Sequence, residues 1–310
     1  MKPELNIPVL SLQLLPGGDC ISLNDNWLFH YTTADSFFKI IKSLKLKTSR
    51  LGKLNDLNEI DYNAYVQVRN PLEMVRYKEY IERECSIACF SQHTLYQYKD
   101  IRYKLIPGCC NPSMWAHYAG NVSGVCLCFD KAKLIEENQK LFGDNIELQE
   151  VHYETNYQPY QPQDTANEFL KQNKNNIFFL KDKSWENESE VRLLLTNIKP
   201  MEEEPMISIA HSLKAIVFSQ KFWHNNKETF IEETIKPNSF LNKMCPIYWL
   251  FLTPNVVAYD ASPGLPLLFE MELAKILKSD SPRAELVRDY VQSLQKKYHM
   301  FEGITNINIS

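Results

Sequence analysis

Short apolar runs of strand length are separated along the chain by stretches whose apolar residues recur with helical spacing. The strand-like runs are rich in β-branched, aromatic and cysteine residues, which is typical of buried strands. They lie at 27–31, 86–91, 124–129, 188–195 and 213–218, with a further strand expected within 249–259. The run at 188–195 alternates, so that Glu188, Glu190 and Arg192 fall on one face of the expected strand.

Helical spacing and capping residues predict the helices between these runs. The segment 32–46 offers Thr32, Thr33 or Asp35 as the helix N-cap. A second helix is expected to begin at Pro71 and to reach about residue 84, and a third to follow the pair Asn111-Pro112. Residues 266–299 predict two helices, with a break at 279–282. The pattern indicates an α+β fold with a mixed or antiparallel central sheet and flanking helices.

The same pattern suggests how the chain is divided. Residues 1–26 form a poorly patterned N-terminal segment, residues 27–260 the α+β core domain, and residues 261–310 a C-terminal helical extension. Within the core domain, 156–175 is rich in Gln, Asn, Pro and Tyr and lacks apolar periodicity. We interpret this stretch as a surface excursion, either a lid or an insertion.

Composition and charge narrow the class of protein. The 310 residues are 44% hydrophobic, which suffices for a sizeable core without metal or disulfide support. A net charge of -4 gives no general attraction for nucleic acid. No apolar run has the roughly 20 residues of a membrane span, and the N-terminus lacks a signal-peptide pattern, so we expect a cytoplasmic protein without a membrane partner. The eight cysteines form no paired C-x-x-C units, so we expect reduced, buried thiols and no metal site.

Four blocks of sequence carry a family resemblance. They are FHYTT followed by LNDLNE, IACFS at 87–91, SMWAHYAGNVSGVCLCFD at 113–130, and FFLKDKSWENESEVRLLL at 178–195. Together they resemble the bacterial domain-of-unknown-function family twenty-nine seventy-one, and LKAIVF at 213–218 fits the closing strand. The resemblance spans roughly 27–220. The chain departs from the family's FNDP motif by carrying Leu54 and Leu57, but it keeps Asn55, Asp56 and Glu59.

A second resemblance suggests a mechanism. The strand His30-x-Thr32 entering a helix, and the later pair Glu188-x-Glu190, look like the nicotinamide-binding His and catalytic Glu of ADP-ribosyltransferase folds, including DNA-modifying toxins. The resemblance implies an ADP-ribosyltransferase-like fold and NAD as substrate. It further implies a nucleic-acid or protein acceptor and a bacterial effector or toxin, in phage defence or with an antitoxin or other neutralising partner.

That chemistry assigns roles to residues. Breaking the bond between nicotinamide and ribose builds positive charge on the sugar, which a carboxylate stabilises. Glu190 is the first choice for this role, and Glu188, on the same strand face, is the second. His30 would bind the ribose or the nicotinamide amide. The other expected NAD-binding residues are Tyr31, Thr32, Arg50, Asn55, Asp56, Tyr118 and Arg192, with the helix start near Thr33 and Lys53 as further phosphate contacts. Arg192 has the alternative role of pairing with Glu190.

Structural alternatives stay open for each group. His30 also fits a hydrogen-bonded structural histidine, and Glu188, Glu190 and Arg192 also fit the solvated face of an amphipathic strand. Asn55, Asp56 and Glu59 also fit a helix cap and its capping partner; as a functional alternative they close over a ligand or bind a divalent cation through their oxygens. The Trp115, His117 and Tyr118 group fits core packing with one polar tip. As other functional classes, we retain an NAD glycohydrolase and a non-catalytic module that senses a ligand or a partner protein.

Overall fold

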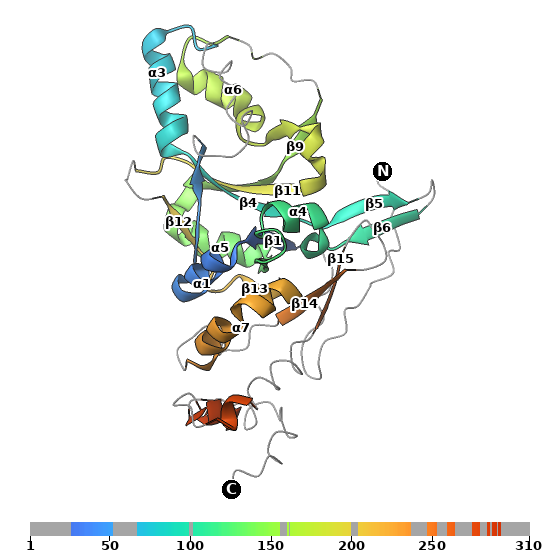
Figure 1. Ribbon diagram of the computed structural model, residues 1–310. Coiled ribbons are helices and arrows are strands. Elements are labelled where there is room, and N and C mark those ends of the chain that lie inside the picture. Colours follow the sequence, from blue (N-terminus) through green and yellow to red (C-terminus); the bar gives the residue numbers. More distant parts are fainter. Residues whose placement is uncertain are drawn as a thin grey trace.

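A mixed β-sheet forms the centre of the protein in the computed structural model (Figure 1). The structure describes residues 26–51, 67–98, 102–155, 160, 162–199, 204–236, 247–252, 259–263, 275–279, 284–285, 287–289 and 291–292. Among them, nine strands belong to the central sheet: β1 (Trp27–Thr32), β3 (Ser49–Arg50), β4 (Ser86–Ser91), β7 (Val125–Asp130), β8 (Ile146–Glu150), β11 (Glu190–Leu195), β13 (Leu213–Ser219), β14 (Ile247–Leu252) and β15 (Tyr259–Pro263).

The order of the strands in the sheet is β15-β14-β13-β7-β1-β4-β11-β8, and β3 pairs with β4. Neighbours are antiparallel except for β13 and β14, which are parallel. The expected α+β class with a mixed sheet is therefore confirmed. The strands expected at 27–31, 86–91, 124–129 and 213–218 are also confirmed, and the region 249–259 contributes to β14 and β15.

Helices and short ribbons surround this sheet. The helices are α1 (Ala34–Ser43), α3 (Pro71–Glu79), α4 (Pro112–His117), α5 (Lys131–Phe142), α6 (Ala166–Phe178) and α7 (Gln220–Ile235), with a π-helical turn at Tyr80–Glu84 and 3-10 turns at Gly108–Cys110, Gly143–Asn145 and Lys183–Glu188. The ribbons pair β2 (Lys45–Lys47) with β12 (Met206–Ser208), β5 (Thr94–Tyr98) with β6 (Arg102–Ile106), and β9 (His152–Glu154) with β10 (Leu180–Asp182).

Local sequence signals explain where several helices begin. The Thr33 side chain caps α1 by accepting a hydrogen bond from the Ser36 backbone N–H. The Asn111 side chain caps α4, and Pro112 occupies its first turn, where no N–H is needed. The helix expected from Pro71 continues to Glu84, but its last turn is π-helical.

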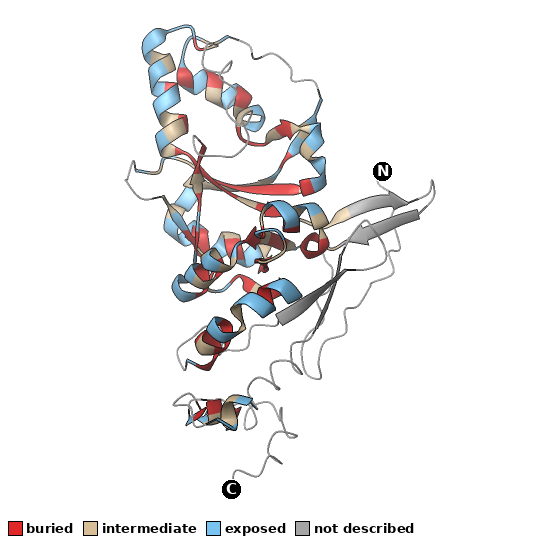
Figure 2. Ribbon diagram, viewed as in Figure 1, coloured by how far each residue is buried: buried red, intermediate tan, exposed pale blue. Residues whose placement is uncertain are grey.

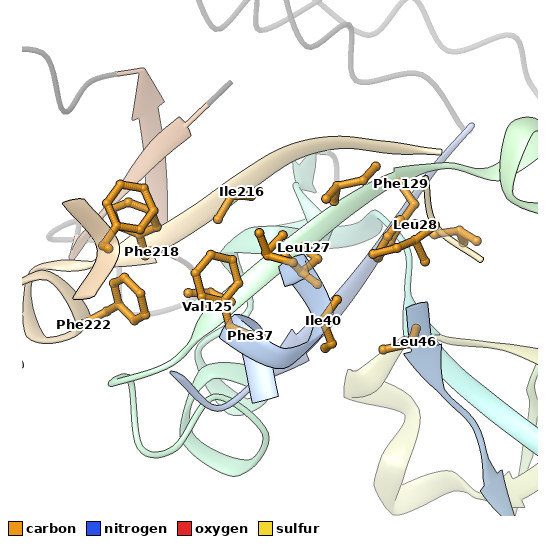
Figure 3. Close-up of a cluster of buried hydrophobic side chains, with 14 of the residues drawn as sticks. Leu28, Phe37, Ile40, Leu46, Val125, Leu127, Phe129, Ile216, Phe218 and Phe222 are labelled. Atoms are coloured by element: carbon orange, nitrogen blue, oxygen red, sulfur yellow. The ribbon is translucent and has the colours of Figure 1, made fainter. Parts of the chain in front are cut away.

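The main core lies on one face of the sheet and includes residues of α1, α5 and α7. Figure 3 shows the part of it to which α1 and α7 contribute. Phe37 and Ile40 of α1 and Phe222 of α7 belong to one buried cluster with alternate residues of the strands, such as Leu127 and Val191. These side chains are almost fully buried. Their burial is the largest favourable contribution to the stability of this half of the protein.

The opposite face of the sheet carries two separate apolar clusters. The α4 cluster packs Trp115 against Tyr31, Cys126 and Val217, over β1, β7 and β13. The α3-α6 cluster packs Tyr77, Phe169, Phe178 and Ile87 together with Leu194, over β4 and β11. Figure 1 shows α3 and α6 side by side at the top of the molecule, and Figure 2 shows the buried residues along the strands beneath them. The boundary between the two clusters falls between β1 and β4, which leaves room for a cavity there.

Two sequence expectations about this region were wrong. Residues 166–175, interpreted as part of a surface excursion, belong to α6, whose Phe169 is completely buried. Apolar positions in α6 are few, but Ala166, Phe169 and Phe178 suffice to anchor it. In addition, β11 begins at Glu190, and Glu188 ends the preceding 3-10 turn instead of lying on the strand. The left-handed backbone of Ser189 (φ 45°) separates the two glutamates.

The expected break in the C-terminal helices cannot be followed, because 280–283 lie outside the described residues. Helical structure is present at 275–277, 284–285, 287–289 and 291–292. Val287 and Val291 pack against the main core, so part of the C-terminal extension is joined to the core domain.

Candidate functional site

A cavity of about 220 Å³ opens where β1 and β4 separate. The two strands pair only at Phe29 and Ser91, whereas β1 pairs with β7 along its whole length. Beyond Phe29, residues of both strands therefore line open space. The other walls are Met114 and Tyr118 from α4, Lys47 and Ser49, and the segment between β10 and β11 with Lys181, Trp185, Glu188 and Glu190.

The segment between β10 and β11 is held by its own hydrogen bonds. Asp182 caps the 3-10 turn by accepting a 2.9 Å hydrogen bond from the Ser184 backbone, and the Ser184 interactions lower the pKa of this carboxyl. At the other end, the Tyr153 hydroxyl accepts a 2.8 Å hydrogen bond from the Glu190 backbone N–H. These contacts fix the positions from which the polar side chains enter the cavity.

Glu188 lies at the centre of a polar network although it is only 6% exposed. Tyr118 donates a 2.6 Å hydrogen bond to its Oε1, and the Lys181 ammonium lies 2.8 Å from its Oε2. The same ammonium lies 3.3 Å from Glu190 Oε2 and 4.7 Å from the centre of the Trp185 ring. One lysine therefore joins the two glutamates, which come from different elements.

Glu190 is paired more fully than Glu188. Arg192 Nε lies 2.8 Å from Glu190 Oε1, and a second guanidinium nitrogen lies 3.2 Å from Oε2. Burial raises the pKa of the Glu190 carboxyl, but the Arg192 guanidinium outweighs it and holds the pKa below its usual value. Glu190 is thus a carboxylate at neutral pH. The pairing of Arg192 with Glu190, one of the two expected roles of that arginine, is confirmed.

The burial of these residues rules out one structural alternative. Glu190 is 4% exposed and Arg192 is 1% exposed, so they do not form the solvated face of an amphipathic strand. Arg192 also donates a 2.9 Å hydrogen bond to the Phe178 carbonyl at the end of α6. Its guanidinium lies beneath Glu190 and is not among the residues that line the cavity.

His30 lines the cavity from β1 and is a neutral acceptor. Its Nδ1 lies 3.0 Å from the Cys89 carbonyl oxygen, which only accepts, so Nδ1 carries the proton and Nε2 has a free lone pair. Burial lowers the pKa of His30, and the hydrogen bond to Cys89 only partly opposes this effect. His30 and Glu190 are not on adjacent strands, since β4 lies between β1 and β11.

The remaining expected residues are divided between the cavity and other places. Tyr31 and Tyr118 line the cavity, although the Tyr31 hydroxyl is used in a 2.5 Å hydrogen bond to the Gly108 carbonyl. Thr32 is buried at the end of β1 and is not among the lining residues. Arg50 lies 3.7 Å from Glu204 and does not line the cavity. Asn55 and Asp56, together with Lys53 and Glu59, lie outside the described residues.

Sequence reasoning missed Lys181, Trp185 and Tyr153. The first two were visible in the block FFLKDKSWENESEVRLLL as a basic and an aromatic residue close to the expected catalytic pair. Tyr153 carried no local signal, because β9 reaches Glu190 only through tertiary packing.

Two kinds of feature are absent from the described residues. No group of three His, Cys, Asp or Glu side chains there is arranged to hold a metal ion. No helix within the described part of the chain combines the length and apolar character needed to cross a membrane.

Fold and site together define an α+β protein with a small, carboxylate-containing cavity between two diverging strands of a mixed sheet. The family model described as "Protein of unknown function (DUF2971)" matches residues 114–193, which confirms the family resemblance over this segment. The match includes two walls of the cavity, from Met114 and Tyr118 to Lys181, Glu188 and Glu190. No curated protein and no solved structure matches the chain.

Proposed function

We propose that the protein is an NAD-consuming enzyme of the ADP-ribosyltransferase type, which breaks the bond between nicotinamide and ribose and transfers ADP-ribose to an acceptor. The observation that carries this proposal is the convergence of His30 with Glu188 and Glu190 on one cavity, although about 160 residues of the chain separate the histidine from the glutamates. A hydrogen-bond acceptor for the substrate, a carboxylate for the developing positive charge and a second carboxylate as general base fit this reaction.

The chemistry assigns a different task to each group. As the glycosidic C–N bond breaks, its electron pair leaves with neutral nicotinamide and the ribose gains positive charge, which the ionised Glu190 stabilises. In the same step the acceptor bonds to the sugar carbon as nicotinamide leaves, and it loses its proton to Glu188. The unprotonated Nε2 of His30 accepts a hydrogen bond from a ribose hydroxyl or from the nicotinamide amide.

The size of the cavity determines how much of NAD enters it. Its volume of about 220 Å³ is below the roughly 300–1,000 Å³ of pockets that enclose a drug-sized ligand. We therefore place only the nicotinamide and its ribose inside. The exposed Lys47, which lines the cavity, is then the cation for the pyrophosphate, in place of Arg50.

The biological setting and the acceptor rest on family resemblance. We propose a bacterial effector or toxin, acting in phage defence or in a toxin–antitoxin system with a neutralising partner, and modifying nucleic acid or protein. If water is the acceptor, the same site acts as an NAD glycohydrolase.

The proposal is tested by incubating the purified protein with labelled NAD and, in parallel, RNA, DNA or cell lysate. Label transfer, nicotinamide release and NAD binding are all measured. We expect release by the wild type, and a decrease of about 10²- to 10⁴-fold in Glu190→Gln and Glu188→Gln. Glu186→Gln is the matched control, because Glu186 lies in the same turn but is exposed.

The outcomes separate the functional classes. Release without transfer to any acceptor indicates a glycohydrolase. Binding of NAD without release indicates a non-catalytic sensor module and overturns the enzymatic proposal. The absence of binding, release and transfer overturns the assignment of NAD as the ligand.

A further inference from the structure

The Lys181 side chain pairs with both carboxylates of the cavity. Its ammonium lies 2.8 Å from Glu188 and 3.3 Å from Glu190, and all three residues are more than nine-tenths buried. Lys181 stands on β10, which pairs in parallel with β9. In this pairing Lys181 is opposite Tyr153, whose hydroxyl binds the Glu190 backbone, so the same ribbon fixes both the lysine and Glu190.

The two carboxylates differ in what else holds their charge. Glu190 has the Arg192 guanidinium on both of its oxygens in addition to Lys181. Glu188 has the Tyr118 hydroxyl and Lys181. A hydroxyl donates a hydrogen bond but supplies no positive charge. Among the ion pairs of the described residues, Lys181 is therefore the only cation at Glu188, whereas Glu190 has two.

We propose that Lys181 is a positioning residue that keeps Glu188 ionised and fixes it beside Glu190, while Arg192 performs this task for Glu190. The inference rests on the proposed function, in which Glu188 takes the proton of the acceptor. A protonated Glu188 is unable to do so.

The physical reason is that two neighbouring carboxylates in a closed cavity do not both remain ionised without compensating cations. When the lysine charge is removed, one carboxyl takes up a proton. Arg192 still pairs with Glu190, so the proton goes to Glu188. Arg192 pairs with Glu190 alone, and Lys181 is the cation on which Glu188 depends. Together they keep both carboxylates ionised, so that one can stabilise positive charge while the other acts as a general base.

The first test follows the carboxyl groups directly and needs no activity. Side-chain carboxyls of Glu are labelled with ¹³C, and their titration is followed by NMR between pH 5 and 9 in the wild type and in Lys181→Met. We expect one additional carboxyl to titrate near neutral pH in the variant. This signal should be absent from the double variant with Glu188→Gln, in which the remaining Glu190 carboxylate keeps Arg192 as its partner. In the double variant with Glu190→Gln it should remain but move to lower pH, because the neighbouring negative charge has been removed. Lys183→Met, an exposed lysine in the next turn, is the control and should match the wild type.

The second test uses nicotinamide release. In Lys181→Met we expect turnover at pH 7 to fall about tenfold for each unit by which the Glu188 carboxyl titrates above pH 7. Turnover should recover as the pH is raised, and KM for NAD should stay within about twofold. Lys181→Arg should restore activity, because it restores the charge. A merely structural lysine would lower turnover equally at every pH.

The outcomes distinguish failure of this inference from failure of the proposed function. If the wild type releases no nicotinamide, the proposed function fails, but the carboxyl titration still decides the role of Lys181. The inference is overturned if Lys181→Met produces no new titration or if the new signal belongs to Glu190. If circular dichroism shows that Lys181→Met is unfolded, Lys181→Gln, which keeps a hydrogen-bond donor without charge, is titrated in its place.

Discussion

The Tyr118 hydroxyl lies 2.6 Å from Glu188 Oε1 and donates a hydrogen bond to it across the cavity. Tyr118 belongs to the end of α4, whereas Glu188 ends the turn before β11, so this bond connects the two walls that the family match includes. Burial, and then the Glu188 carboxylate, raise the pKa of Tyr118. The hydroxyl therefore stays a proton donor over the whole physiological pH range.

Removing this hydroxyl should weaken the connection between the walls. We expect Tyr118→Phe to lower the free energy of unfolding by about 1.5–3 kcal/mol, the range for a hydrogen bond to a charged group. Urea denaturation measures the change. In a Glu188→Leu background the same substitution should cost less than half as much, and an equal cost in both backgrounds would show that the bond contributes nothing.

Removing the guanidinium beneath Glu190 should cost considerably more. Arg192→Met leaves a buried carboxylate with Lys181 as its only charged partner among the described residues, and breaking such a pair costs about 3–5 kcal/mol. The double variant Arg192→Met/Glu190→Leu should be more stable than the single variant, because no buried charge is left unpaired. Exposed Lys133→Met is the control, with an expected change below about 0.5 kcal/mol. Thermal and urea unfolding provide the comparison.

The lowered pKa of His30 predicts how stability depends on pH. On acidification, His30 of the unfolded chain takes up a proton near pH 6.5, before His30 of the folded protein does. The contribution of His30 to the free energy of unfolding is therefore fully present above this pH and is lost below it. The pKa of Glu190 is also lowered, so its contribution to stability is lost only below about pH 4.5. We therefore expect Tm to fall between pH 7.5 and 5.5 and to fall less steeply in His30→Gln. His117→Gln, at an exposed histidine, should keep the wild-type slope.

Gly124, at the start of β7, is required by a close approach of the backbone. A Cβ atom at this position would lie 2.1 Å from the Thr32 carbonyl oxygen, so the strand pair β1-β7 would have to move. Gly124→Ala should destabilise the protein by about 1–3 kcal/mol, as overpacking does.

Gly143→Ala provides the comparison. Nothing lies within 4 Å of its added Cβ, so any cost there, about 1–3 kcal/mol, comes from a backbone conformation (φ 57°, ψ -129°) that L side chains rarely adopt. Urea denaturation measures both changes, and a loss below about 0.5 kcal/mol at Gly124 would contradict this account.

Local sequence determined most of the secondary structure on which the site is built. The strands that became β1, β4, β7 and β13, the Asn111-Pro112 helix start and the Thr33 cap all follow from interactions within a few residues, such as apolar runs and side-chain caps. The types of residue that the proposed reaction needs, above all His30 and the two glutamates, were also readable from motifs. These elements were predictable because their causes are local.

Tertiary structure decided how these groups meet. The sequence placed Glu188 and Glu190 on one strand face, but a left-handed residue separates them, and a buried lysine from another strand brings them together. The separation of β1 from β4 creates the cavity, and it depends on the two apolar clusters that hold these strands to different helices. The sequence pattern also fitted a solvated strand face for Glu188, Glu190 and Arg192. In the folded chain these residues are buried and form a network of paired charges, because a charge removed from water needs a partner. Contacts between residues distant in sequence, such as Tyr118 with Glu188, have no local signature, so only the folded chain reveals them.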